Sequence, residues 1–149
     1  MIIKGIDNQT VEIKVTNYQH PDSLDRDWDG NWLNTYLKVE SKVGNWQTVD
    51  PSLTTWEIQE LIDWFIDLAN NTKPKWTDME FTEPNLSLYL KNDFNDLNKK
   101  IRIKFDLESR PKSATIDKEF FVDFEANSPE LKRLADDLTS ELRRYPIRK

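Results

Sequence analysis

The 149-residue chain contains no cysteine, one histidine and three glycines. Without cysteine it has no disulfide, no thiolate metal ligand and no cysteine nucleophile. The single histidine, His20, excludes any site that needs two imidazole groups. Three glycines are too few for a phosphate-binding loop of the GxGxxG or GxxxxGK type. We therefore expect no metal, no cofactor and no catalytic residues of these classes.

Long hydrophobic runs and an excess of positive charge are also missing. Charged residues interrupt the apolar-rich stretches every three or four positions, so we expect no membrane-spanning segment. Residues 1–6 do not form a secretion signal, and the protein is expected to be cytoplasmic. With 27 acidic and 21 basic residues the net charge is −6, which disfavours direct binding to nucleic acid. The length suits one globular domain over residues 1–149.

Alternating apolar and polar residues predict several β-strands, each with one buried and one exposed face. The pattern occurs in residues 11–15, 32–40, 46–49, 86–90, 101–107 and 120–124. Such one-sided alternation is typical of antiparallel sheets.

Two segments instead show the 3.6-residue period of amphipathic helices. Residues 54–70 begin with a capping box of Thr54 and Glu57. The last helix is expected to have Ser128 as its N-cap and Pro129 at its first position, and to end before Pro146. The predicted fold is α+β: a mostly antiparallel sheet of about six or seven strands with the two helices packed on one face.

The sharpest local motif is the acidic run Asp25-Arg26-Asp27-Trp28-Asp29-Gly30, which matches the first half of an EF-hand calcium loop. The second half does not fit, because the twelfth position is Tyr36 instead of a bidentate glutamate. We interpret the run as an acidic loop and keep a small calcium- or carbohydrate-binding module as the alternative. A third hypothesis, a hydrolase with two paired carboxylates, has no support from residue spacing.

Aromatic residues lie within this acidic region. Between residues 22 and 69 there are ten acidic and three basic residues, a local charge of −7. Trp28 and Trp32 lie in or beside the acidic loop, and tryptophan is common among interface hot spots. We therefore expect a partner-binding surface centred on five residues: Asp25, Asp27, Trp28, Asp29 and Trp32. Trp32 also shares a strand face with Tyr36, which would suit a second copy of the chain equally well.

Several short motifs together resemble a known family. They are Asp-Trp-Asp-Gly-Asn-Trp-Leu at 27–33, Trp46 followed by Asp-Pro-Ser-Leu-Thr at 50–54, Phe81 followed by Glu-Pro-Asn-Leu at 83–86, Ile-Lys-Phe-Asp-Leu-Glu at 103–108 and Glu-Leu-Arg-Arg-Tyr-Pro at 141–146. Their order resembles the WapI-like family of bacterial immunity proteins over about residues 11–146.

The resemblance implies a protein that is not an enzyme. Members of this family protect the cell against the C-terminal domain of a cell-wall-associated polymorphic toxin, which in the type case attacks tRNA. The expected partner is therefore one cognate toxin domain. An acidic aromatic surface suits that role, because a nuclease needs a basic cleft to hold phosphate.

Overall fold

The computed structural model of the chain describes residues 1–24, 28–115 and 118–149. Its strands form two four-stranded antiparallel sheets, and within each sheet neighbouring strands are consecutive in the sequence. The first sheet contains β1 (Ile2–Lys4), β2 (Thr10–Tyr18), β3 (Trp32–Ser41) and β4 (Gly44–Thr54). The second contains β5 (Asp78–Glu80), β6 (Leu86–Leu90), β7 (Lys99–Phe105) and β8 (Phe120–Ala126).

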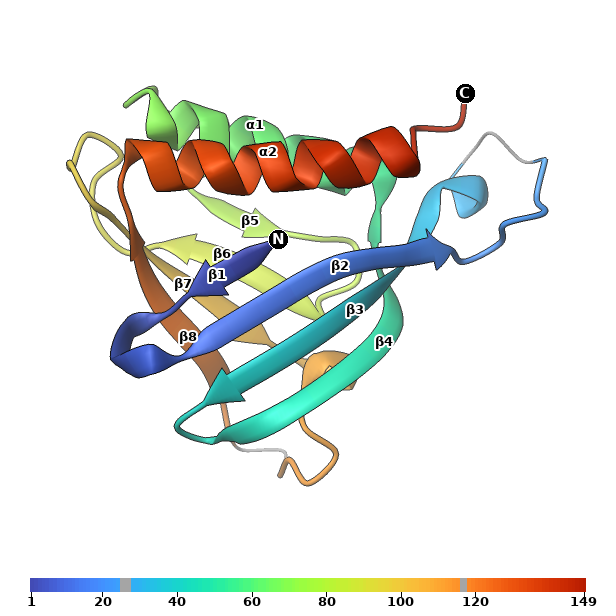
Figure 1. Cartoon of the computed structure of the whole chain (residues 1–149), viewed down its shortest axis with the longest axis horizontal. Coiled ribbons are helices and arrows are strands. Elements are labelled where there is room, and N and C mark those ends of the chain that lie inside the picture. Colours follow the sequence, from blue (N-terminus) through green and yellow to red (C-terminus); the bar gives the residue numbers. More distant parts are fainter. Residues whose placement is uncertain (25–27, 116–117) are drawn as a thin grey trace.

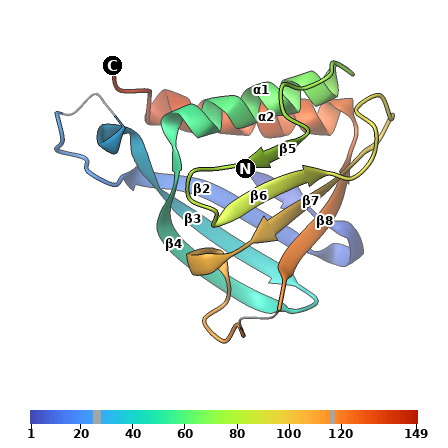
Figure 2. The same cartoon turned by 180° about the vertical axis from the view of Figure 1, so that it is seen from behind.

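Two helices, α1 (Thr55–Ala69) and α2 (Ser128–Arg144), lie side by side across one side of both sheets (Figure 1). The view from behind shows the same pair above the second sheet (Figure 2). On α2, Arg133 donates to the Ile2 carbonyl at 3.1 Å and the Glu141 carboxylate accepts from the Val15 N–H at 3.3 Å. Among the described residues no helix is both long enough and apolar enough to cross a bilayer.

The α+β class is confirmed, and the structure adds how the strands are divided. Eight strands are split between two sheets, where the sequence indicated about six or seven in one. The strands β1 and β5 are each three residues long, too short for alternation to reveal. The helix α1 lies between β4 and β5 in the sequence, and the chain passes from the first sheet to the second across it. Alternation shows which face of a strand is buried, but it does not show which strands are neighbours.

Helix starts follow from capping chemistry. The expected box at α1 is present: the Thr54 hydroxyl accepts from the Glu57 N–H, and the Glu57 carboxylate accepts from the Thr54 N–H at 2.8 Å. The expected N-cap of α2 was wrong by one residue. Asn127, not Ser128, is the N-cap, and its side chain accepts from the Glu130 N–H at 3.1 Å. Asparagine caps as well as serine, and Glu130 completes the box only from this register.

The core lies between the two sheets and beneath the helices. Apolar side chains from the inner faces of both sheets are buried there together with the stripes of α1 and α2. Trp46 of β4 joins the sheets, since its ring packs edge-on against Phe105 and Phe120, each with centroids 5.6 Å apart. Its indole N–H also donates to the Ser109 carbonyl at 2.9 Å, in the short helix η3 (Leu107–Ser109).

Candidate functional site

Three tryptophans from different parts of the chain meet beside the loop that connects β2 to β3. Trp28 directly precedes the short helix η2 (Asp29–Asn31) in this loop, Trp32 begins β3, and Trp56 lies in the first turn of α1. Trp28 stacks on Trp56 with ring centroids 5.2 Å apart and planes at 25°, and it meets Trp32 edge-on at 6.4 Å. Trp28 remains 48% exposed. We call Trp28, Trp32 and Trp56 the tryptophan cluster.

Strand pairing explains why Trp56 joins this cluster. Trp32 pairs with Thr54 at the end of the β3–β4 ladder, and α1 starts directly after Thr54. The first turn of the helix is therefore held next to the start of β3. Glu57 fixes that turn further, because its carboxylate also accepts from the Thr82 N–H at 2.6 Å.

Asn31, in the short helix η2 (Asp29–Asn31), anchors the loop to two other elements. Its side chain is fully buried, and its Oδ1 accepts from the Thr55 hydroxyl at 2.7 Å and from the Arg148 N–H at 2.9 Å. Its Nδ2 donates to the Arg148 carbonyl at 3.1 Å. One amide side chain thus ties the loop to α1 and to the C-terminal segment.

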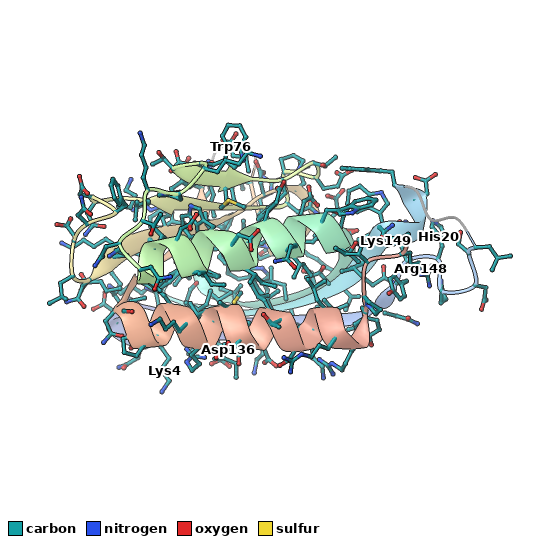
Figure 3. All side chains as sticks on the ribbon, turned by 90° about the horizontal axis from the view of Figure 1, so that it is seen from above. Lys4, His20, Trp76, Asp136, Arg148 and Lys149 are labelled. Atoms are coloured by element: carbon teal, nitrogen blue, oxygen red, sulfur yellow. The ribbon has the colours of Figure 1, made fainter. Side chains whose placement is uncertain are left out.

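The Arg148 side chain holds the first half of the loop. Its guanidinium lies 3.6 Å from the centroid of the Tyr18 ring and donates to the carbonyls of His20 and Pro21, both at 2.9 Å. A third bond, to the Ser23 carbonyl, is 3.3 Å long. Figure 3 shows Arg148, Lys149 and His20 together at one end of the molecule, beyond the end of the helices. An open hollow of about 500 Å³ lies between residues 19–23 and Asp29.

The surroundings of the cluster are acidic. Trp56, Glu60, Asp63 and Asp67 follow a spacing that places them along one side of α1, and the helix has no lysine or arginine. Glu60 and Asp63 are exposed, as is Asp29 beside Trp28. The exposed side of α1 therefore extends from an aromatic end to an acidic one.

The structure brings together part of the predicted site. Trp28, Asp29 and Trp32 lie at the cluster, whereas Asp25 and Asp27 lie outside the described residues. Sequence reasoning missed Trp56, Asn31 and Arg148. Trp56 lies two residues after the N-cap Thr54, which indicates its position in the first turn of α1 but not that Trp28 would be its neighbour. Nothing in the sequence indicated that Asn31 and Arg148, so distant along the chain, would pair.

Metal ligands and carboxyls with shifted pKa values are the other features on which chemistry could rest. Within residues 1–24, 28–115 and 118–149, no group of three His, Cys, Asp or Glu residues is placed to hold a metal ion. A raised carboxyl pKa occurs at Asp50 in β4, where burial is the largest cause and the charges of Glu108 and Glu83 add to it. What the tryptophan cluster offers is an aromatic contact surface with carboxylates around it.

Comparison with known proteins agrees with the resemblance seen in the sequence. The model of the immunity protein WapI-like family matches residues 1–146, which adds the first strand to the range that the motifs had covered. No curated protein matches the chain. Because the match extends over nearly the whole sequence, the chain belongs to the WapI-like family of immunity proteins.

Proposed function

We propose that this protein binds and neutralises a cognate polymorphic toxin domain of nuclease or tRNase type, and that it does so in the cytoplasm as a single globular domain. Family membership implies binding to a cognate toxin protein, and the family is typically non-enzymatic. The type of toxin and the contact surface are our own inference.

The observation that carries the proposal is the stacked pair of Trp28 and Trp56 among carboxylates, in which Trp28 remains 48% exposed and Trp56 is partly buried. Large aromatic side chains bury much area at small entropic cost, so an exposed tryptophan held in place by stacking is suited to anchor a partner. Asn31 and Arg148 fix residues 20–23 and the η2 end of the loop beforehand, which lowers the ordering cost of binding.

Charge favours a basic partner. A domain that cleaves RNA or DNA must attract phosphate, so its cleft is expected to be positive. The acidic residues Asp29, Glu60 and Asp63 would accelerate the encounter with such a cleft and reject acidic surfaces. The partner contact is proposed to centre on Asp25, Asp27, Trp28, Asp29 and Trp32, with Trp56 added from the structure.

The test is calorimetric titration with the toxin domain encoded beside this gene. Trp28→Ala and Trp56→Ala should each weaken binding by at least about 30-fold, the effect of losing one hot-spot residue. Trp76→Ala is the matched control, because Trp76 is 54% exposed but lies on another side of the molecule (Figure 3). Equal affinities for all three variants would exclude the cluster as the contact surface.

Rescue of cells tests the function itself. Co-expression of the wild-type protein should restore growth to cells that produce the toxin domain, and the Trp28→Ala variant should restore it less well. A wild-type protein that neither binds nor protects would reject the proposed function.

A further inference from the structure

Four strands form the edges of the two sheets, namely β1, β4, β5 and β8. An edge strand presents unpaired backbone N–H and C=O groups, so proteins usually shorten, charge or cover it. Three of these edges are protected in such ways. β1 and β5 are each three residues long, and β8 carries Asp123 and Glu125. Gly5 also packs so closely on β8 that a Cβ atom there would lie 2.5 Å from Val122 Cγ1.

The remaining edge, β4, has no such protection over most of its length. It is eleven residues long, and residues 43–49 (Val-Gly-Asn-Trp-Gln-Thr-Val) contain no charged side chain although 32% of the chain is charged. Asn45 and Gln47 are exposed, and Val49 is 61% exposed. Within β4 the only proline is Pro51, which lies beyond residues 43–49. In the part of the chain that the structure describes, no strand pairs with β4 on the side away from β3.

The direction of the backbone groups in β4 follows from hydrogen bonds elsewhere in the sheet. Met1 and Ile13 exchange two backbone bonds of 2.9 Å, so the backbone groups of Ile13 face β1. In an antiparallel sheet, successive residues of a strand bond to opposite neighbours. The backbone groups of Glu12 therefore face β3, and those of its partner Lys38 face β2.

The same alternation carries across β3 into β4. The backbone groups of Leu37 point the opposite way from those of Lys38 and therefore face β4, where Leu37 pairs with Thr48. Thr48 is thus bonded to β3, and the neighbouring positions Asn45, Gln47 and Val49 direct their N–H and C=O groups away from the sheet. Among the described residues no hydrogen bond to these outward groups is present within the chain.

The short helix η3, which follows β7 of the second sheet, approaches β4 on the inner face of the first sheet. The Trp46 side chain, which reaches Ser109, Phe105 and Phe120, belongs to that face. The segment around Ser109 therefore packs on the inner face of β4. The outward N–H and C=O groups of Asn45, Gln47 and Val49 lie in the plane of the sheet and point away from β3.

We infer that β4 pairs with the β4 strand of a second copy of this chain, antiparallel about a twofold axis that places Gln47 opposite Gln47. In this register the outward groups of Asn45 meet those of Val49, and about six backbone hydrogen bonds form. The two first sheets become one continuous eight-stranded sheet. An isologous contact of this kind is self-complementary, as a twofold dimer requires.

A second copy is the occupant that the charges favour. Two molecules of net charge −6 repel each other over most of their surfaces, but residues 43–49 are neutral. The twofold register places Asp50 opposite Gly44, so no two like charges face each other across the strands. The contact lies at the end of β4 away from Thr54, and thus away from the tryptophan cluster, which stays accessible in both copies.

Two measurements on the full chain test this inference. Sedimentation of the wild-type protein should show a concentration-dependent dimer with twice the mass of one chain. A cysteine introduced by Gln47→Cys should form a covalent dimer under mild oxidation, because the Cα atoms of such a pair lie about 5.5 Å apart, within the range for a disulfide. The natural chain has no cysteine, so only this residue can react. Lys14→Cys, on the exposed face of the interior strand β2, is the control that should remain monomeric.

Edge variants complete the test. Val49→Lys places a charge beside the pairing edge and should weaken dimerisation by at least about tenfold, whereas Val49→Thr should not. Circular dichroism and binding of the toxin domain should be unchanged in both variants, which separates this inference from the proposed function. A wild-type monomer at all concentrations, a dimer that persists in Val49→Lys, or equal crosslinking of the two cysteine variants would overturn the inference.

Discussion

The backbone N–H of Arg148 donates to the side-chain oxygen of Asn31 at 2.9 Å, and the Asn31 amide donates back to the Arg148 carbonyl at 3.1 Å. The buried Asn31 side chain thus bonds both the N–H and the C=O of Arg148, as a neighbouring strand would do in a sheet. Because the same oxygen accepts from Thr55, this contact joins three segments that are far apart in the sequence.

Replacing Asn31 should therefore lower the stability of the whole fold. Asn31→Ala leaves the Thr55 hydroxyl and both Arg148 backbone groups without these partners, and the free energy of unfolding should fall by about 2–3 kcal/mol. Urea denaturation followed by fluorescence measures this. Asn34→Ala on the outer face of β3 is the control and should change stability by less than about 0.5 kcal/mol. Similar losses in the two variants would contradict the role given to Asn31.

Arg148→Lys should loosen the β2–β3 loop without unfolding the protein. Lysine keeps the charge but cannot donate to several carbonyls in a planar fork or stack on Tyr18 as a guanidinium does. Faster amide exchange is expected in residues 19–24, together with altered Trp28 fluorescence. Arg143→Lys, on the exposed side of α2, should leave both signals unchanged. Unchanged exchange in the Arg148 variant would show that the loop holds its shape alone.

The raised pKa of Asp50 makes a prediction about pH. Burial, with smaller effects of Glu108 and Glu83, raises this pKa above the ordinary aspartate value. The folded state then binds the proton more tightly than the unfolded chain does. The group stabilises the fold below its unfolded pKa, and this contribution disappears as the pH rises through the raised value.

Asp50→Asn should remove this dependence. The difference in unfolding free energy between the variant and the wild type should favour the variant increasingly as the pH rises from about 3 to 7. Glu108→Gln should show a smaller change in the same direction, because burial is the larger cause. A difference that does not vary with pH would mean that Asp50 titrates normally in the folded protein.

Trp46→Ala should separate the two sheets at their contact by η3. The indole packs against Phe105 and Phe120 and donates to Ser109, so its loss should cost about 3 kcal/mol, near the lower end for a large aromatic residue. Trp46→Phe keeps part of the packing and should cost less. Thermal denaturation with Trp76→Ala as an exposed control provides the measurement. A Trp46→Ala protein as stable as that control would show that other contacts hold the sheets together.

Periodicity and capping predicted most of the regular structure. Both helices and the six longer strands were recognisable because each has one apolar face, and the Thr54–Glu57 box marked the start of α1 correctly. The two-sheet division was not predictable, since it depends on which strands become neighbours after α1. Alternation also continued through Leu107, which instead adopts a positive φ of 46° in η3.

The candidate site was predictable only in part, for the same reason. Trp28, Asp29 and Trp32 stand close together in the sequence, so composition drew attention to them. Trp56 reaches Trp28 only because Trp32 pairs with Thr54, a contact between strands that local patterns do not encode. The Asn31–Arg148 contact spans almost the entire chain and has no local signature.

The bonds from α2 to the first sheet bear on how the molecule is made. Arg133 and Glu141 reach the backbone of β1 and β2, whose residues are synthesised more than a hundred positions earlier. During translation the side of the first sheet that α2 covers is expected to stay exposed until α2 has left the ribosome. Folding is therefore expected to finish in one late step, and slowing synthesis ahead of α2 would prolong the exposure of the unfinished sheet to proteases and chaperones.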